Sequence, residues 1–444
     1  MSVLTYLAMF GWIPAIIYLF QRYQPQKAVI IAFIAAWLFL PKASFPVIGL
    51  PDYTKISATC YGIVLATLAF DIQRFKKIRF SWIDIPLIVF SLQPFISSIT
   101  NDLGPYDGIS SSLAQIVRWG IPYLLGRIYF DSLDGLKKLA VAIFIGGLMY
   151  TPLCLIEIRL SPILHRTIYG FEGTGRSFVQ AIRLGGYRPS VFMEHGLAVG
   201  MWMMAASVIG ISLWKTGVIK QLWNIDIKLF LICLVATFIL VKSTGAYLLF
   251  VLGLCILFSA WYWRNKLLLI IFSLAICYYL FLGASGNITT ARIEQIVSFT
   301  TSLVGEDRAQ SLEFRLSNEQ ILGDRARERP LTGWGGWGRN QVYDEATGKQ
   351  LTTTDSLWII AFGTGGIIGL VSLTAFMLLP SLMFCLRCYP PVSWSHPKVA
   401  PAATLAIIMV LYMFDCISNA MINPIFTLAS GGISGVVVKH IKDY

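Results

Sequence analysis

The residues of this chain best suited to chemistry are arginines in two polar segments that interrupt strongly apolar sequence. The first segment covers residues 159–190 and the second covers residues 284–355. A guanidinium group pairs bidentately with phosphate oxygens, so clustered arginines favour a phosphate or diphosphate ligand. Contact with lipid headgroups is the alternative for the first segment. The candidate ligand-binding arginines are Arg176, Arg183, Arg188, Arg315 and Arg339.

The first polar segment ends in the sequence GTGRSFVQAIRLGGYRPSVFMEHG. Arg176 and Arg183 are two helical turns apart, so they would share one face of a short helix, which the glycine pair after them could end. Glu194 and His195 follow at the start of an apolar stretch, where ionisable groups are rare and usually functional. Both are candidate proton acceptors. A histidine bonded to a backbone carbonyl is the alternative for His195.

The second polar segment contains SLEFRLSNEQILGDRARERPLTGWGGWGRN. The apolar spacing predicts a helix around Arg315 and Glu319, with Gly323 as its C-terminal cap. These two charged residues are i,i+4 neighbours, so an intrahelical ion pair is the alternative to a ligand contact by Arg315. Upstream, the sequence ARIEQIVSF at 291–299 predicts an amphipathic helix at the membrane surface.

Glycines and tryptophans follow one another closely in the run LTGWGGWGRN. Glycines such as Gly333 allow a tight turn and a close approach of the backbone to a ligand. Trp334 and Trp337 could stack on a sugar ring, and they could equally be tryptophans anchored at the membrane interface. The hypothesis for this turn is therefore a sugar-binding surface.

Asp355 stands where the second polar segment returns to apolar sequence, in TTTDSLWIIAFGTGGIIGL. A carboxylate at this boundary is costly unless it is paired or hydrated. It could act as a general base with a raised pKa. It could also cap the N-terminus of the helix that follows.

The elements that must position these residues are apolar helices. The chain has 444 residues, is 56% hydrophobic and only 13% charged, and has a mean hydropathy of +0.68. Apolar stretches of about 17–25 residues recur along it, and this is the length that crosses a bilayer as a helix. Their continuous apolar character excludes a β-barrel. The sequence therefore predicts an all-α, polytopic integral membrane protein with residues 1–444 in a single domain.

We expect about 12–13 transmembrane helices, with a shorter external loop at 159–190 and a large external loop at 284–355. The large loop separates the spans that lie near residues 283 and 356. The candidate spans are residues 3–21, 27–41, 56–72, 82–99, 112–130, 138–158, 191–213, 227–242, 244–262, 266–283, 356–386, 399–415 and 423–438.

The formal net charge of +12 comes in large part from short loops rich in Lys and Arg. Such loops stay on the cytoplasmic side of a membrane. One of them holds Arg74, Lys76, Lys77 and Arg79, and alternation of the spans from it places both polar segments and the N-terminus outside. Arginines on the outer face run against this bias. We therefore expect an anionic ligand there, and no nucleic acid.

Motifs for metal or nucleotide chemistry are missing from the sequence. The eight cysteines lie in or beside apolar stretches. The pair Cys385 and Cys388 has no second pair or histidine cluster nearby, so we expect no zinc site. There is no Walker-type loop, nucleotide fingerprint, HExxH or GxSxG. We therefore expect no metal, no cofactor and no cytosolic nucleotide donor.

Five motifs, taken in order, resemble the O-antigen polymerase and O-antigen ligase superfamily of membrane glycosyltransferases. They are RPSVFMEHG, KSTGAYLLF, RLSNEQ, RPLTGWGGWG and TDSLWIIAFGTGGIIGL, which cover roughly residues 180–375. Arg188 and Arg315 stand where the family carries its arginines. Ligases usually have a histidine and then an asparagine where this chain has Asp355 and Ser356. The resemblance therefore favours a polymerase, with Asp355 as the base.

The resemblance implies metal-independent sugar transfer at the outer face of the bacterial cytoplasmic membrane. The donor would be an undecaprenyl-diphosphate-linked oligosaccharide, and a second such unit would be the acceptor in making O-antigen, capsule or exopolysaccharide. The diphosphate would be stabilised by Arg188 and Arg315, with help from Arg176, Arg183 or Arg339. The acceptor proton would pass to Asp355, or else to Glu194 or His195.

Other functions stay open alongside the polymerase. An O-antigen ligase and a protein O-oligosaccharyltransferase belong to the same superfamily. A polysaccharide or lipid flippase is the rival from another class, but its charges should lie near the membrane midplane rather than at the outer boundary. The partners we expect are membrane lipids, together with a flippase and a chain-length regulator of the same pathway.

Overall fold

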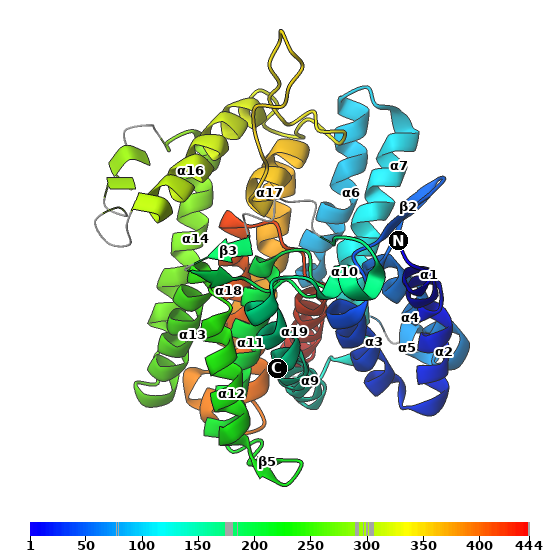
Figure 1. The fold of residues 1–444 in the computed structure, drawn as a ribbon, viewed down its shortest axis with the longest axis vertical. Coiled ribbons are helices and arrows are strands. Elements are labelled where there is room, and N and C mark those ends of the chain that lie inside the picture. Colours follow the sequence, from blue (N-terminus) through cyan, green and yellow to red (C-terminus); the bar gives the residue numbers. More distant parts are fainter. Residues whose placement is uncertain are drawn as a thin grey trace.

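The computed structural model describes residues 1–76, 78, 80–173, 181–183, 185–288, 293–295, 297–298, 301 and 306–442. Within these residues the chain is mostly helical, and its three sheets are short antiparallel hairpins. Figure 1 shows the helices packed side by side, with part of the second polar segment at the top of the molecule. The predicted class, a helical polytopic membrane protein, is confirmed.

The elements follow one another along the chain with short connections. The first half contains α1 (Val3–Phe10), α2 (Trp12–Arg22), α3 (Pro25–Phe39), β1 (Ser44–Val47), β2 (Leu50–Thr54), α4 (Lys55–Phe70), α5 (Gln73–Lys76), η1 (Trp82–Asp84), α6 (Ile85–Thr100), α7 (Gly104–Gln115), η2 (Ile116–Gly120), α8 (Ile121–Tyr129), α9 (Leu133–Leu160), α10 (Leu164–Tyr169), β3 (Ile182–Arg183), β4 (Gly186–Tyr187) and α11 (Gly196–Lys215). The second half contains β5 (Gln221–Leu222), β6 (Ile225–Asp226), α12 (Ile227–Leu240), α13 (Thr244–Tyr262), α14 (Leu267–Ser285), α16 (Glu306–Arg327), α17 (Leu357–Met383), η4 (Phe384–Cys388), η5 (Pro391–Ser395), α18 (Ala400–Ser418) and α19 (Pro424–Lys442).

Eight of the described helices are long and apolar enough to cross a membrane, or nine if α1 and α2, which are bent by 43°, form one span. Every predicted span falls on a helix, but this count is below the expected one. The difference comes from α3, α4 and α12, which are apolar but shorter, and from the span expected at 112–130. The structure divides that span among α7, η2 and α8.

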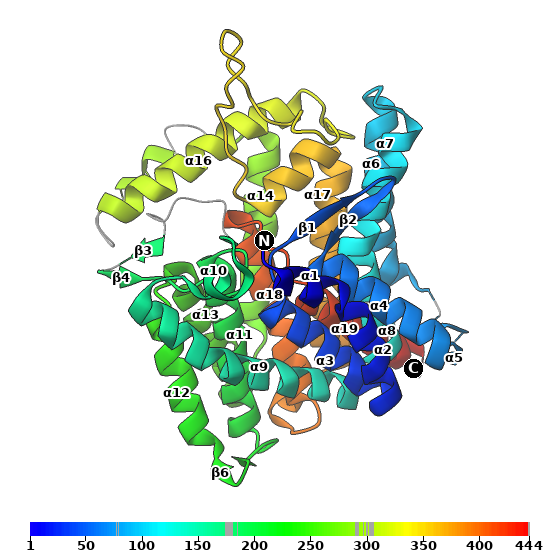
Figure 2. The same cartoon turned by 45° about the vertical axis from the view of Figure 1, so that its right-hand side comes forward.

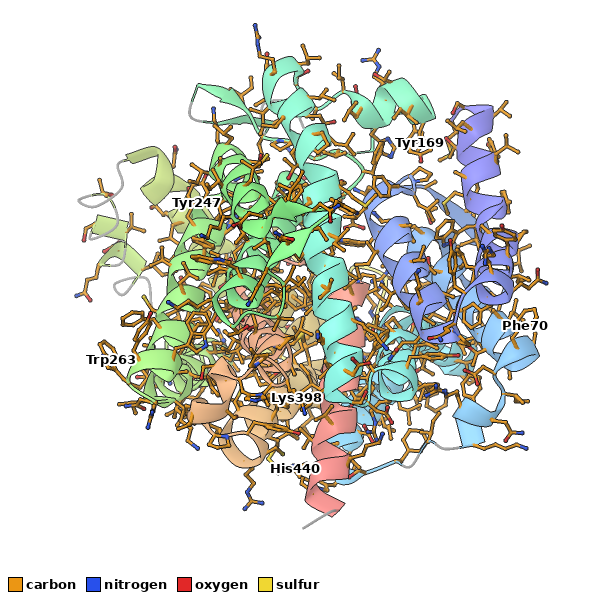
Figure 3. All side chains as sticks on the ribbon, turned by 90° about the horizontal axis from the view of Figure 1, so that it is seen from below. Phe70, Tyr169, Tyr247, Trp263, Lys398 and His440 are labelled. Carbon is orange, nitrogen blue, oxygen red and sulfur yellow. The ribbon has the colours of Figure 1, made fainter. Side chains whose placement is uncertain are left out.

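The centre of the bundle is formed by α11, α18 and α19, most of whose residues are buried. A helix that is apolar all round is typically enclosed by other helices. α19 crosses α8 at close range, because Gly126 lies against the backbone of Leu428 and Gly431 against the backbone of Tyr123. Small residues permit such close approach in membrane bundles. Viewed from below, side chains fill the space around α19 (Figure 3).

A buried ion pair joins the start of α6 to α8 and α19. Arg127 Nη2 donates a hydrogen bond of 3.2 Å to Asp84 Oδ2, and both side chains are almost fully enclosed. The Tyr123 hydroxyl donates to Asp84 Oδ1 at 2.7 Å and is also hydrogen-bonded to Ser434 at 2.7 Å. These contacts hold α6 in place at the end remote from the long loop.

α17 is interrupted by a break at Gly366, where φ is 62° and ψ is −160°. The loop after α16 adds its backbone to this break. Ile367 N donates to Pro330 O at 2.7 Å, and Trp334 N donates to Gly363 O at 2.8 Å. A side chain at Gly366 would collide with the carbonyl of the loop residue that follows Pro330. The glycine break therefore lets the loop lie directly on α17.

Polar side chains of α6, and of the residue that follows it, hold the same loop by hydrogen bonds. Gln93 Nε2 donates to Thr332 O at 3.1 Å, and Asn101 Nδ2 donates to Gly333 O at 2.9 Å. Ser97 Oγ donates to the carbonyl of Thr364 in α17 at 2.9 Å. The loop is thus fixed between α6 and the broken turn of α17. Figure 2 shows α16 running obliquely over the top of α14, with part of the loop rising above α16.

Candidate functional site

Arg315 and Asp355, which the sequence singles out in the second polar segment, line one small cavity. Its wall also includes Glu319 and Ser356, and its volume is about 10 Å³. That is room for about one water molecule. Arg315 comes from the middle of α16 and Asp355 from the residues just before α17, so the packing of α16 on α17 brings them together.

Glu319 links three helices at this cavity. Its Oε1 accepts a hydrogen bond of 2.6 Å from Ser356 Oγ, and its Oε2 accepts one of 2.7 Å from the Tyr279 hydroxyl. Burial raises the pKa of Glu319, and these hydroxyl donors and the charge of Arg315 oppose that rise. The expected intrahelical ion pair with Arg315 is not among the ion pairs of the described residues. Instead of this ion pair, Glu319 has two hydroxyl partners, Tyr279 of α14 and Ser356 at the start of α17.

α16 also runs further than the sequence indicates. The predicted cap at Gly323 is wrong, because the helix continues to Arg327. Arg327 Nη1 donates to Gly283 O at 2.9 Å, and its guanidinium lies over Gly323, where a larger side chain would be crowded. The end of α14 therefore holds the end of α16.

Asp355 does not cap α17. The helix begins at Leu357 with Ser356 as its N-cap, so the interpretation of Asp355 as the capping residue is wrong. The Ser356 side chain makes no capping bond either, since its hydroxyl donates to Glu319. Nearby, Thr353 N donates to Asn318 Oδ1 at 3.0 Å, which fixes the approach to the helix. Asp355 therefore lies at a helix N-terminus, where partial positive charge favours anions.

Arg188 is almost fully enclosed, with 6% of its surface exposed. Its Nη2 donates to Lys242 O at 3.2 Å, and its stem covers Gly196, where any side chain would collide with it. The segment that follows is held by Glu157, whose Oε2 accepts from Ser190 N at 2.9 Å and Val191 N at 2.7 Å. Glu157 thus fixes the backbone that carries the arginine.

Glu194 and His195 are neighbours with different surroundings. His195 is the N-cap of α11, and its Nδ1 accepts a hydrogen bond of 3.1 Å from Leu197 N. This is a structural use of one ring nitrogen. Glu194 lines a larger cavity and interacts electrostatically with Lys55.

The larger cavity has a volume of about 810 Å³ and borders the first turns of α17. Leu357 and Ile360 line this cavity, whereas Ser356 and Ile359 line the small one. Neighbouring residues of a helix point in different directions. The two cavities therefore flank the beginning of α17, next to Asp355.

The glycine–tryptophan turn divides into docking residues and one exposed tryptophan. Gly333 has φ of 69° and lies against the backbone of α17. The Trp334 ring stacks against Arg325 and Arg329, with guanidinium carbons 3.5 and 4.7 Å from the ring centroid. Trp337, by contrast, is 82% exposed and lines the larger cavity. The structure thus offers Trp337, rather than Gly333 or Trp334, to a ligand in that cavity.

The remaining predicted arginines are further from these cavities or not described. Arg339 Nη1 donates to Asn101 O at 3.1 Å and so fastens the loop to the end of α6. Arg176 lies outside the described residues. Of the amphipathic helix expected at 291–299, residues 293–295 and 297–298 are described, and they are helical. The prediction of a short helix that ends at the glycine pair is wrong over 182–187. There β3 and β4 form a hairpin with Gly185 at its turn. Arg183 belongs to that hairpin, and its side chain is not described.

Several residues of the site were not singled out from the sequence. Glu157, Lys55 and Arg118 are single charges at the ends or in the middle of apolar stretches, and that pattern is itself a signal of function. Gln93 gives no such signal, because its role depends on a loop more than two hundred residues away. Within the described residues, no group of three or more His, Cys, Asp or Glu side chains could hold a metal ion.

The fold defines a multi-pass helical membrane protein with polar-lined cavities around the start of α17. Residues 229–374 match the family described as O-antigen ligase. The chain therefore carries an O-antigen ligase family domain, and this family covers both O-antigen ligases and O-antigen polymerases. The matched range is thus similar to membrane enzymes of polysaccharide assembly. No curated protein matches the chain.

The matched range begins within α12 and ends within α17. It includes Arg315, Glu319 and Asp355, which line the small cavity. Arg188 and Glu194 lie before it. The family match thus covers one of the two polar segments and the helices on both sides of it.

Proposed function

We propose that this protein is a polysaccharide polymerase that joins undecaprenyl-diphosphate-linked repeat units at the outer face of the bacterial cytoplasmic membrane. The observation that carries the proposal is the pair of cavities beside the first turns of α17, one of them lined by Arg315 and Asp355. The larger cavity has the size of a ligand site, and the small one brings a cation and a carboxylate together beside the same helix end. The replacement of the ligase His-Asn pair by Asp355 and Ser356 supports a polymerase over a ligase.

The proposed reaction is a single inverting displacement. Asp355 takes the proton from a hydroxyl of the acceptor sugar, and that oxygen attacks the anomeric carbon of the donor. The bond between the anomeric carbon and the diphosphate breaks, and the diphosphate leaves on its lipid. Arg315 and Arg188 stabilise the negative charge that builds on it, and fixed charge aimed at a leaving group is often the largest catalytic contribution.

Roles for the other candidates follow from their surroundings. Glu194 is the second candidate for the base, since its carboxylate lines the larger cavity. His195 is a weaker one, because its Nδ1 accepts a backbone hydrogen bond. Trp337 is proposed to stack on a sugar of the bound glycan, since its ring is exposed beside the same cavity.

An O-antigen ligase is the second candidate function, because the matched family carries that description. The donor and the leaving group would be the same. The acceptor would be a sugar of lipid A-core instead of a second lipid-linked repeat unit. The two functions therefore differ in what accumulates when the enzyme is lost.

The proposal is tested in cells that lack the gene and are complemented with Arg188→Ala, Arg315→Ala or Asp355→Ala. A polymerase defect leaves single repeat units on the lipid and removes long glycan from the surface. Full-length lipid-linked polymer left untransferred would instead identify a ligase. Glu345→Ala, an exposed change in the same loop, is the control and should leave chain length unchanged. Normal chain length in all three variants at normal protein levels overturns the proposal.

A further inference from the structure

Three cations line the larger cavity, Lys42, Lys55 and Arg118, together with three carboxylates, Asp52, Asp107 and Glu194. Lys42 and Arg118 both line it, and neither forms an ion pair in the part of the chain that the structure describes. The carboxylates in its wall have donors or a cation of their own. Asp52 and Asp107 accept hydrogen bonds from hydroxyl or indole groups, and Glu194 interacts with a lysine. Lys42 and Arg118 are therefore available to pair with an anionic ligand.

These cations lie at similar depth in the bundle. Lys42 and Lys55 are close enough to repel each other electrostatically. Cys60 Sγ donates to Val117 O at 3.5 Å, which places Arg118 little more than one helical turn below Lys55 along α4. Because all three line the same cavity, one anionic group can attract them together.

The position of Arg118 is unusual for a surface charge. It lies in η2, a π-helical turn within the helical run from α7 to α8, and inside the span predicted at 112–130. Such turns occur frequently at functional sites. Its guanidinium has no hydrogen bond to any described residue, although ionisable side chains at membrane depth are normally paired. The missing partner is explained if a ligand supplies it.

We propose that this cavity is a second anion-binding site, which holds the diphosphate of a second polyprenyl-linked glycan, the acceptor, against Arg118 and Lys42. This inference rests on the proposed polymerase function. A volume of about 810 Å³ is within the usual range for small-ligand sites. It accommodates a diphosphate with its first sugars, while the lipid chain remains in the membrane.

The shape of the cavity wall suits such a ligand. Asp107, Ser111 and Arg118 lie on one face of the run from α7 to η2 and all line the cavity. Asp107 and Arg118 are about 16 Å apart along the helix axis. A short oligosaccharide bound at Arg118 therefore extends toward Trp337. The Nε1 of this tryptophan donates a hydrogen bond of 2.5 Å to Asp107 Oδ1. From there its far end can approach Asp355 at the start of α17.

Counting bound lipids by native mass spectrometry tests the inference. The probe is undecaprenyl diphosphate added to purified protein in detergent. The wild type should bind a second molecule, and Arg118→Ala should weaken that second event roughly ten-fold or more, as expected for a lost charge-assisted contact. Arg118→Lys should retain part of it. Lys349→Ala, in the exposed loop, should have no effect.

The competing source of phosphate is an ordinary lipid headgroup. Phosphatidylglycerol in excess should leave the second event unchanged, and its displacement of the probe would overturn the inference in favour of a headgroup site. A single binding event that Arg118→Ala does not alter would also overturn it. Neither result affects the polymerase proposal, which is tested separately by chain growth in the Arg188→Ala, Arg315→Ala and Asp355→Ala cells.

Discussion

At the scale of single residues, the geometry of the small cavity depends on Glu319. Its two carboxylate oxygens accept hydrogen bonds from Ser356 of α17 and Tyr279 of α14. The residue thereby fixes the peptide next to Asp355 while Arg315, one turn away on α16, faces the same cavity. Glu319 is mostly buried, has hydroxyl partners and forms no ion pair with a described residue. We therefore expect its ionisation to make the stability of the fold depend on pH.

The first prediction concerns the pH dependence of stability. Burial raises the pKa of Glu319 above its unfolded value of about 4.3. Its contribution to stability is therefore fully present below about pH 4.3 and is lost as pH rises through the raised folded value. The Gln side chain of Glu319→Gln is neutral at every pH. The melting temperature of this variant should therefore rise relative to that of the wild type as the pH increases through this window. Glu313→Gln, exposed on the same helix, should show no such trend, and a constant difference for Glu319→Gln would refute the assignment.

The second prediction concerns Glu157, which has no exposed surface. Its carboxylate accepts hydrogen bonds from three backbone N–H groups, those of Leu164, Ser190 and Val191. Glu157→Gln puts an amide donor against at least one of these donors, which should destabilise the fold by about 1–3 kcal/mol. It should also reduce chain growth by displacing Arg188. Denaturant unfolding and glycan length are the two measurements, and unchanged values in both would contradict the assigned role.

At the scale of elements, the site depends on the contact between the polar loop and the broken α17. The loop donates and accepts backbone hydrogen bonds at the turn around Gly366, and polar residues of α6 hold it from the other side. α16, the loop and α17 therefore act as one unit that sets the distance between Arg315 and Asp355.

The third prediction follows from the backbone of Gly366. Its φ of 62° and the adjacent loop carbonyl leave no space for a side chain. Gly366→Ala should therefore cost about 1–3 kcal/mol in strain and loosen the loop, with faster proteolysis of residues 330–340 and loss of activity. Gly336→Ala is the matched control, since nothing surrounds that position. Equal protease sensitivity of the two variants would count against the docking role.

The apolar stretches predicted the helices because a continuous apolar run of this length has few other structures in a bilayer. The convergence of Arg315 and Asp355 was also predictable, since both belong to one loop between two spans. The partners of Glu319 were not, because they come from helices that are far apart in the sequence. The hairpin at 182–187 was missed because spacing alone cannot distinguish a helix face from a turn for so short a segment.

At the scale of the whole molecule, the two ends of the bundle have different tasks. One end carries the cavities, the polar loop and the arginines. At the far end of α6, the buried pair of Asp84 and Arg127 joins α6 to α8 and α19. We expect this pair to keep α6 in position, and α6 in turn holds the polar loop by its hydrogen bonds.

The fourth prediction concerns this buried pair. Asp84→Ala removes the carboxylate that pairs with the buried Arg127 and should destabilise the protein by about 3–5 kcal/mol. The exposed pair of Asp134 and Lys138 provides the control, and Asp134→Ala should cost no more than about 1 kcal/mol. Thermal unfolding in detergent measures both, and comparable losses for the two variants would show that Asp84 has no special role in the bundle.

The central claim is that one lipid-linked glycan serves as both donor and acceptor, with Asp355 as the base. The most direct test supplies the purified enzyme with an undecaprenyl-diphosphate-linked repeat unit as its sole glycan and measures product lengths. The account predicts a ladder of longer lipid-linked chains with the wild type and none with Asp355→Asn. It would be contradicted if the wild type gave no ladder but transferred the glycan once lipid A-core was added, or if Asp355→Asn gave the same ladder.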